Sequence, residues 1–189
     1  MSQLCSDEEL QDLMRTMQSD DGEELEQVDR LIAVYPEDAR LHFLRGSILA
    51  GIGRPIEAMP ALRMAVELAP DFAIARFQLG FFQLTSGEAA DALSTWGPLA
   101  LLPADHYLRK FVAGLTHLIR DEFAEATAQL REGIAANDEN PALNNDMQIL
   151  VDQASELLAA SNADKEGRQS ASATSFLLDQ FSDRGGGPR

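Results

Sequence analysis

The chain has 189 residues, of which 45% are hydrophobic, 6% aromatic and 24% charged, and its formal net charge is −16 at pH 7. This length and composition fit one domain with a mainly aliphatic core. Because 31 acidic residues face 15 basic ones, the chain lacks the basic footprint of a nucleic-acid-binding protein. The same charge disfavours an anionic membrane surface, and the single Cys5 excludes an internal disulfide framework.

The sequence also bears on localisation. No apolar run approaches the roughly 20 residues that a membrane-spanning helix needs. The first residues, MSQLCSDEEL, have neither the basic start nor the apolar core of a signal peptide. A single cysteine is compatible with a reducing compartment. We therefore expect a cytoplasmic protein.

Residues 1–38 are the most acidic part of the chain, with 12 acidic side chains against two arginines. Apolar residues there form two helical faces, of which the first has the spacing i, i+3, i+4 and i+7. The first pattern predicts a helix over residues 7–18 and consists of Leu10, Leu13, Met14 and Met17. The second predicts a helix that Pro36 ends and consists of Leu25, Val28, Leu31 and Ile32.

From Ala39 onward the sequence repeats with a fixed period of about 34 residues, which is the spacing between Gly46 and Gly80. Small residues hold this spacing in the first half of each copy, at Gly46, Gly80 and Gly114, and in the second half, at Ala58, Ala92 and Ala126. An aromatic position is occupied by Phe43, Phe77 and Phe111, and a large position by Leu62, Trp96 and Leu130. A fixed period of this length predicts an array of identical supersecondary units.

Small residues in both halves predict two helices in close contact. A glycine inside a helix costs about 1 kcal/mol relative to alanine, so three glycines in register imply a packing reason. We expect each of them to lie opposite the small residue of the second helix, with the large residue filling the space beside them. Gly53 and Gly87 are expected to end the first helices in the left-handed conformation, whereas Asp121 departs from the pattern in the third copy.

A period of about 34 residues with these small, aromatic and proline positions resembles the tetratricopeptide repeat (TPR), as found in small bacterial proteins of that family. The resemblance covers about residues 39–140 and, more weakly, the segment before them. It implies an all-α fold, a right-handed α-solenoid of helix–turn–helix repeats with capping helices. We assign repeats to 39–72, 73–106 and 107–140, a degenerate repeat or two-helix cap to 1–38, and a C-terminal cap helix to 141–160.

Prolines mark two irregular places in the repeats. The second helix of the first repeat is expected to begin at Pro55 and to kink at Pro60, which removes a backbone hydrogen bond. In the next repeat Gly97 and Pro98 follow Trp96 in the middle of the second helix, which predicts a bend or a break there.

Residues 161–189 differ from the repeats in composition. The part up to Ser175 is small and polar, which predicts a flexible linker. Bulky apolar residues return after it, at Phe176, Leu177, Leu178 and Phe181. Two interpretations have equal weight: a tethered docking peptide for this or another protein, or an extra helical turn on the cap helix.

The sequence offers little catalytic chemistry. No pair of its three histidines, His42, His106 and His117, has the i, i+4 spacing of a helical metal site. No nucleophile elbow, phosphate loop or dinucleotide motif occurs, and the carboxylates are scattered. We therefore expect no enzyme, no bound metal and no cofactor.

In proteins of the family that this chain resembles, the first helices of successive repeats line a concave groove that binds a peptide. On this basis the groove is expected to consist of Phe43, Ile74, Phe77, Phe81, Leu84, Leu108, Phe111, Leu115 and Leu118. An exposed surface this apolar marks an interaction site, although the same residues would form ordinary core if the helices face the other way.

One branch of the family binds a peptide carboxylate through Lys, Arg and Asn. Here those places are taken by residues such as Phe43, Ser47, Gln78, Leu108 and Val112, so we expect an apolar ligand.

The sequence thus predicts a non-enzymatic scaffold or adaptor that binds an apolar peptide or helix of another protein. The main alternative is a secretion-type chaperone for an aggregation-prone client, and a weaker one is a regulatory subunit of an enzyme complex. Self-association through the C-terminal tail is a further hypothesis.

Overall fold

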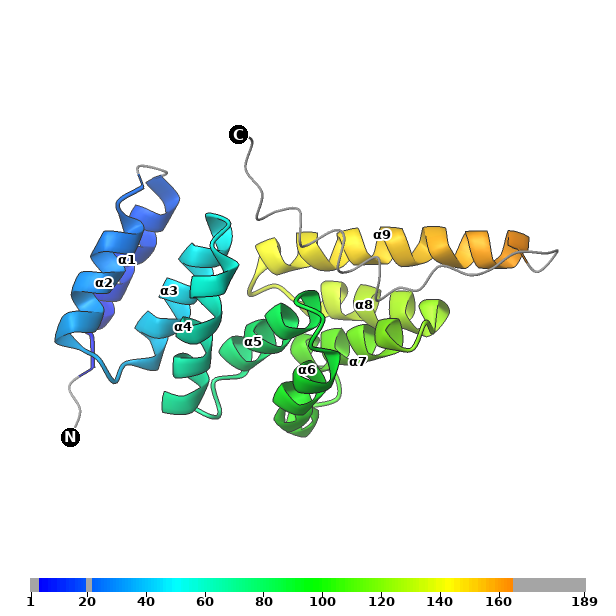
Figure 1. Ribbon diagram of the computed structural model, residues 1–189, viewed down its shortest axis with the longest axis horizontal. Helices are drawn as coiled ribbons and strands as arrows, with labels where there is room; N and C mark the ends of the chain where they lie inside the picture. The colour runs from blue at the N-terminus through cyan, green and yellow to red at the C-terminus, as the bar shows by residue number, and fades with distance from the viewer. Residues whose placement is uncertain (1–3, 20–21, 165–189) are drawn as a thin grey trace. The chain divides into compact units, whose positions relative to one another are not determined.

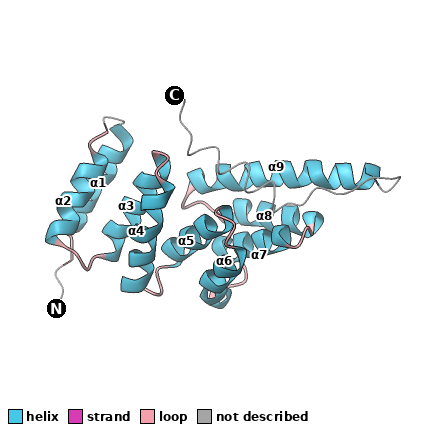
Figure 2. Cartoon of the chain, in the orientation of Figure 1, coloured by secondary structure: helices cyan, strands magenta, loops and turns pink. Residues whose placement is uncertain are grey.

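Figure 1 shows the chain as a computed structural model, which describes residues 4–19 and 22–164. Within these ranges the protein forms nine α-helices and one 3₁₀ helix, and no strand (Figure 2). The prediction of an all-α protein is therefore confirmed for this part of the chain. The predicted linker and the motif Phe176, Leu177, Leu178 and Phe181 lie outside the described residues.

The chain divides into two compact units, and the boundary follows Phe82. The described residues 4–82 belong to the first unit and residues 83–164 to the second. The boundary falls within helix α5 (Ala73–Thr85), so this helix has residues in both units.

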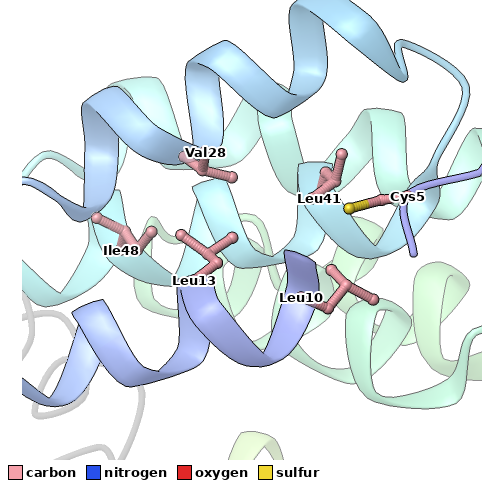
Figure 3. Close-up of a cluster of buried hydrophobic side chains, with 6 residues drawn as sticks. All are labelled: Cys5, Leu10, Leu13, Val28, Leu41 and Ile48. Atoms are coloured by element: carbon pink, nitrogen blue, oxygen red, sulfur yellow. The ribbon is translucent and has the colours of Figure 1, made fainter. Parts of the chain in front are cut away.

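The first unit begins with α1 (Asp7–Ser19), α2 (Glu24–Val34) and α3 (Ala39–Gly51). The first two helices agree with the predicted ones to within a few residues. Their apolar faces meet α3 in a core that consists of Cys5, Leu10, Leu13, Val28, Leu41 and Ile48 (Figure 3). Met14 belongs to the predicted apolar face of α1 but is 46% exposed.

Helix α4 (Pro55–Leu68) packs along α3 and completes the helix–turn–helix unit (Figure 1). It begins at Pro55, as predicted, and continues unbroken as an α-helix through Pro60. A Cβ placed on Gly46 of α3 would lie 2.7 Å from the Cγ of Leu62 in α4. The predicted close contact at this glycine is thus confirmed, but its nearest neighbour is the large Leu62.

The second unit contains α6 (Ala89–Trp96), the 3₁₀ helix η1 (Gly97–Leu101), α7 (Tyr107–Ile119), α8 (Phe123–Ala136) and α9 (Pro141–Asp164). The predicted break after Trp96 is confirmed, because the α-helix ends there and a 3₁₀ helix follows. The contact seen in the first unit recurs between α7 and α8, where a Cβ on Gly114 would lie 2.7 Å from the Cγ of Leu130.

Helix α9 packs on α8 and is longer than the predicted closing helix. Four apolar residues of its first half are buried: Leu143, Met147, Leu150 and Val151. Leu157 and Leu158 are only partly buried. The N-terminal half of α9 therefore provides most of the cover for α8.

The period of the sequence reappears in the backbone hydrogen bonds that end each first helix. The N–H of Arg54 donates to the carbonyl of Leu49 at 2.8 Å, and the N–H of Gly53 to that of Ala50 at 3.1 Å. The same pair of bonds recurs one period later at Glu88 and Gly87, and two periods later at Glu122 and Asp121. This is the Schellman pattern, which places one residue in the left-handed region.

The residues in that left-handed position are Gly53, Gly87 and Asp121, with φ of 72°, 85° and 58°. The two glycines confirm the prediction. Asp121 departs from the pattern in residue type only, because its backbone keeps the conformation of the glycines. An aspartate enters this region more readily than most residues, since its short polar side chain can hydrogen-bond locally.

Candidate protein-interaction surface

The first helices of two neighbouring repeats lie side by side within the first unit. The Ser47 hydroxyl of α3 donates to Oε1 of Gln78 in α5, at 3.1 Å. Near one end of the two helices the rings of Phe43 and Phe72 approach to 5.1 Å between centroids. Along α5 the rings of Phe77 and Phe81 are stacked at 6.2 Å.

Five residues of α3 and α5 stay partly exposed along this contact and define what we name the α3–α5 face: Phe43, Ser47, Ile74, Gln78 and Phe81. Their positions follow from helical spacing, because i and i+4 on α3, and i, i+4 and i+7 on α5, fall on one side of each helix. The face is mainly apolar with one hydrogen-bonded polar pair at its centre. The contacts that it can make with a ligand are therefore mainly apolar.

The basic side chains of Arg40 and Arg76, near this face, form hydrogen bonds with groups outside it. Arg40 donates to both carboxylate oxygens of Asp38, at 2.9 and 2.7 Å, and to the carbonyl of Cys5 at 2.7 Å. Arg76 donates from Nε and Nη2 to the carbonyl of Pro70, at 3.1 and 2.6 Å. Both arginines bind groups near the beginnings of α3 and α5, so neither is a dedicated carboxylate clamp on this face.

The structure places the nine predicted groove residues in two different environments. Phe43, Ile74 and Phe81 are partly exposed and belong to the α3–α5 face. The other six are buried, with at most 3% exposure: Phe77, Leu84, Leu108, Phe111, Leu115 and Leu118. Their side chains form core in this structure, in contrast to the expected open groove.

Phe111 shows the physical reason for this difference. A Cβ on Gly133 of α8 would lie 2.5 Å from the Phe111 ring, so the missing side chain of this glycine makes room for the ring. Tyr107 adds an edge-on contact to the same ring at 5.8 Å. Gly133 was the signal in the sequence that identifies Phe111 as core, because a mid-helix glycine usually has a packing reason.

The three histidines have local structural roles. The ring of His42 donates from Nε2 to the carbonyl of Pro36 at 2.8 Å, and Nδ1 of His106 accepts the N–H of Leu108 at 3.2 Å as the cap of α7. His117 pairs through Nδ1 with the Glu122 carboxylate at 2.5 Å. Among the residues that the structure describes, no group of three His, Cys, Asp or Glu side chains could hold a metal ion.

Sequence reasoning missed one surface and one buried charge. Helix α4 carries exposed apolar residues on the side away from α3, and Asp38 is a buried carboxylate that organises the N-terminal residues. The spacing of Ile56, Pro60, Met64 and Leu68 signals the former, because a helix that packs on one side needs only one apolar face.

No helix among the described residues has the length and apolar character to span a membrane.

Taken together, the helix pairs and their repeated caps define an all-helical protein with a TPR-like fold. Among solved structures the chain is similar to residues 41 to the end of MamA, a TPR-containing protein, from Desulfovibrio magneticus RS-1. The TM-score is 0.56 and the identity 14%, and the match covers 86% of this chain and 96% of that chain. At this identity the likeness concerns the fold alone. No protein-family model matches the chain, and no curated protein matches it.

Proposed function

We propose that this protein is a non-enzymatic protein–protein interaction module that binds an apolar peptide or helix of a partner on its α3–α5 face. The observation that carries the proposal is the partly exposed row of Phe43, Ile74 and Phe81 around the Ser47–Gln78 hydrogen bond. Aromatic side chains that stay accessible on a rigid pair of helices provide large contact area at a low cost in conformational entropy. The TPR-like fold supports the same conclusion.

The local roles of all three histidines support the non-enzymatic part of the proposal, because they leave no histidine in a catalytic arrangement. The charge supports a protein partner over a nucleic acid. A scaffold function needs only a stable surface of the right shape.

Site-specific photo-crosslinking tests this function. A photoreactive phenylalanine analogue replaces Phe81 or Phe43 in the full chain, which is expressed in its native host. A control chain carries the analogue at Leu101, which is 90% exposed but lies in the second unit. We expect one defined set of partners to crosslink from positions 43 and 81 and not from position 101. The same products from all three positions would contradict the proposal.

A second arm separates binding from folding. Phe81→Ala should weaken capture of the crosslinked partner at least tenfold while the circular dichroism spectrum stays that of the parent. If the partner proves to be a single aggregation-prone client that precipitates without this protein, the chaperone form of the function is favoured over an adaptor.

A further inference from the structure

Helix α4 is apolar on two opposite sides. One side packs on α3 and consists of Ala58, Ala61, Leu62 and Ala65, all buried. The other side is exposed and consists of Ile56, Pro60, Met64 and Leu68, which we name the α4 stripe. Ile56 is 87% exposed, Met64 41% and Leu68 36%. Residues spaced by four form one ridge along a helix, and covering that ridge removes apolar surface from water.

The charged residues beside the α4 stripe are balanced and follow a fixed order. Arg54 and Glu57 lie at the N-terminal end of the helix and form an ion pair at 2.7 Å. Arg63 and Glu67 lie toward its C-terminal end, and both are exposed. The signs along the helix are therefore positive, negative, positive and negative, and every sign is reversed when the helix is read from its other end. This order is complementary to a second copy of α4 that runs in the opposite direction.

One register of such an antiparallel pair matches both the charges and the apolar residues. When a two-fold axis passes through Pro60, a residue of α4 meets the residue that lies equally far on the other side of Pro60 in the second copy. Ile56 then meets Met64 of the second copy, and Glu57 meets Arg63 of the second copy. Each contact occurs twice, because the same surface of both copies takes part.

The charges distinguish this register from an alternative one. A centre two positions further along the helix also aligns apolar residues, such as Ile56 with Leu68 of the second copy. It places Glu57 against Glu67 of the second copy, however, and like charges that meet at an interface are unfavourable. A centre at Pro60 avoids that contact.

The net charge of the chain also favours this surface for self-association. Each copy carries a formal charge of −16, so two copies repel each other where their surfaces are rich in acidic residues. Helix α4 with its N-cap residue Arg54 contains two arginines and two glutamates and has no net charge. Two copies can therefore approach through α4 without net local repulsion.

We propose that the protein forms an antiparallel homodimer through the α4 stripe, with Pro60 on the two-fold axis. In this dimer Ile56 packs on Met64 of the second copy, and Glu57 pairs with Arg63 of the second copy. All these residues belong to the first unit and none to the α3–α5 face, so the interface does not rest on the function proposed above. One helix from each copy buries less than the roughly 800 Å² per partner of a standard interface, so we expect a dissociation constant of about 10–100 µM.

Sedimentation equilibrium of the full chain tests the dimer. Between about 5 and 500 µM protein, in about 150 mM NaCl to screen the repulsion, the data should fit a monomer–dimer equilibrium. Ile56→Asp should raise the dissociation constant at least tenfold, because it places a charge within the α4 stripe. Leu101→Asp is the matched control, since Leu101 is 90% exposed but lies in the second unit. A parent chain that stays monomeric, or an equal loss with Leu101→Asp, would overturn the proposal.

A charge exchange tests the contact between Glu57 and Arg63. Glu57→Arg and Arg63→Glu should each raise the dissociation constant at least tenfold, because each brings like charges together at both ends of the interface. The double variant should return it to within about threefold of the parent value, since the pair is then reversed and not removed. Arg30→Glu, at an exposed arginine on α2, changes the net charge as Arg63→Glu does and should leave the dimer intact. A double variant that dimerises no better than either single variant would rule out this register.

Disulfide formation measures the register directly. Under mild oxidation with diamide, Pro60→Cys should link two copies, because the two-fold axis brings both Cα atoms within the range of a disulfide. Ile56→Cys should not, because the two residues at this position lie about 12 Å apart along the helix axes. The parent is the control, since its one cysteine, Cys5, is buried. Crosslinking through position 56 and not through position 60 would overturn the antiparallel arrangement.

One further variant separates this dimer from association through the C-terminal apolar motif. Phe176→Ser/Phe181→Ser in the full chain should dimerise with the dissociation constant of the parent. Loss of the dimer in this variant would show that the C-terminal motif holds the two copies together, and would overturn the assignment to α4.

Discussion

Asp38 determines how the N-terminal residues attach to the first repeat. Its side chain is 2% exposed and accepts hydrogen bonds from the backbone N–H of Cys5 at 3.0 Å and of Arg40 at 3.0 Å. The Arg40 guanidinium donates to both oxygens of the same carboxylate. Burial alone would raise the pKa of Asp38, but the hydrogen bonds from Arg40 and Cys5 outweigh it and hold the pKa below its ordinary value. One carboxylate thus joins the segment before α1 to the start of α3.

Replacing this carboxylate with its neutral isostere should weaken the first unit. We expect Asp38→Asn to lower the free energy of unfolding by about 2–3 kcal/mol, since it removes charge-assisted hydrogen bonds and leaves Arg40 paired only with the exposed Asp7. Asp29→Asn is the matched control, because Asp29 pairs with Arg45 at 2.7 Å but its side chain is 49% exposed. Asp29→Asn should lower the free energy of unfolding by less than about 1 kcal/mol. Urea titrations of both variants measure the difference.

The pH dependence has a definite sign. The pKa of Asp38 is lower in the folded chain than its ordinary 3.8, so its stabilisation is complete above that value and is lost as the pH falls through the folded pKa. The difference in the free energy of unfolding between the parent and Asp38→Asn should therefore be constant above about pH 5 and should become smaller below about pH 4. If this difference in the free energy of unfolding were the same at pH 7 and pH 3, the charge of the carboxylate would contribute nothing to stability.

At the scale of the helix pair, the repeated glycine fixes how closely two helices approach. Gly46 and Gly114 each face a buried leucine of the next helix, with the backbone nitrogen of that leucine 3.3 and 3.1 Å from a Cβ placed on the glycine. The leucine cannot move away freely, because Leu62 and Leu130 are both fully buried. A larger residue at the glycine must separate the helices or force the leucine out of its rotamer.

Gly46→Ala and Gly114→Ala should therefore destabilise the protein by about 1–3 kcal/mol, although alanine is the better helix former. Gly51 is the control, because it is the last residue of the same helix α3 and a Cβ there meets nothing within 4 Å. Gly51→Ala should raise stability by up to about 1 kcal/mol. Thermal melts of the three variants test both signs. A gain in stability at position 46 or 114 would mean that the contact does not limit the helix spacing.

The sequence was sufficient to predict these pairs because the first and third repeats share the same glycine contact and all three repeats share the same helix end. It could not predict which side of a first helix is core. Spacing places Phe43 and Phe111 at equivalent positions, yet Phe43 pairs with Phe72 and stays partly exposed, while Phe111 fills the space that Gly133 leaves. Burial depends on the residue across the contact, which has no place in the pattern of one helix. For the same reason the exposed side of α4 was overlooked.

At the scale of the whole chain, electrostatic repulsion should oppose folding. The net charge of −16 is spread over many exposed acids, and three ion pairs among the described residues, Arg15–Asp12, Arg30–Glu26 and Arg54–Glu57, join side chains that are both at least 45% exposed. Exposed pairs of this kind contribute little. The Asp38–Arg40 pair differs from them, because its carboxylate is buried and salt screens it only weakly.

Moderate salt should therefore stabilise the protein. Raising NaCl from about 20 to 200 mM shortens the Debye length from about 20 to 7 Å and screens the repulsion between distant acids, so we expect the melting temperature to rise by about 2–5 °C at pH 7. The same titration at pH 5 is the control, because the charge is smaller near the sequence pI of about 4.4 and the gain should shrink. Differential scanning calorimetry at both pH values measures this change in melting temperature. A melting temperature that falls with salt at pH 7 would show that the exposed pairs, such as Arg15–Asp12 and Arg54–Glu57, outweigh the repulsion.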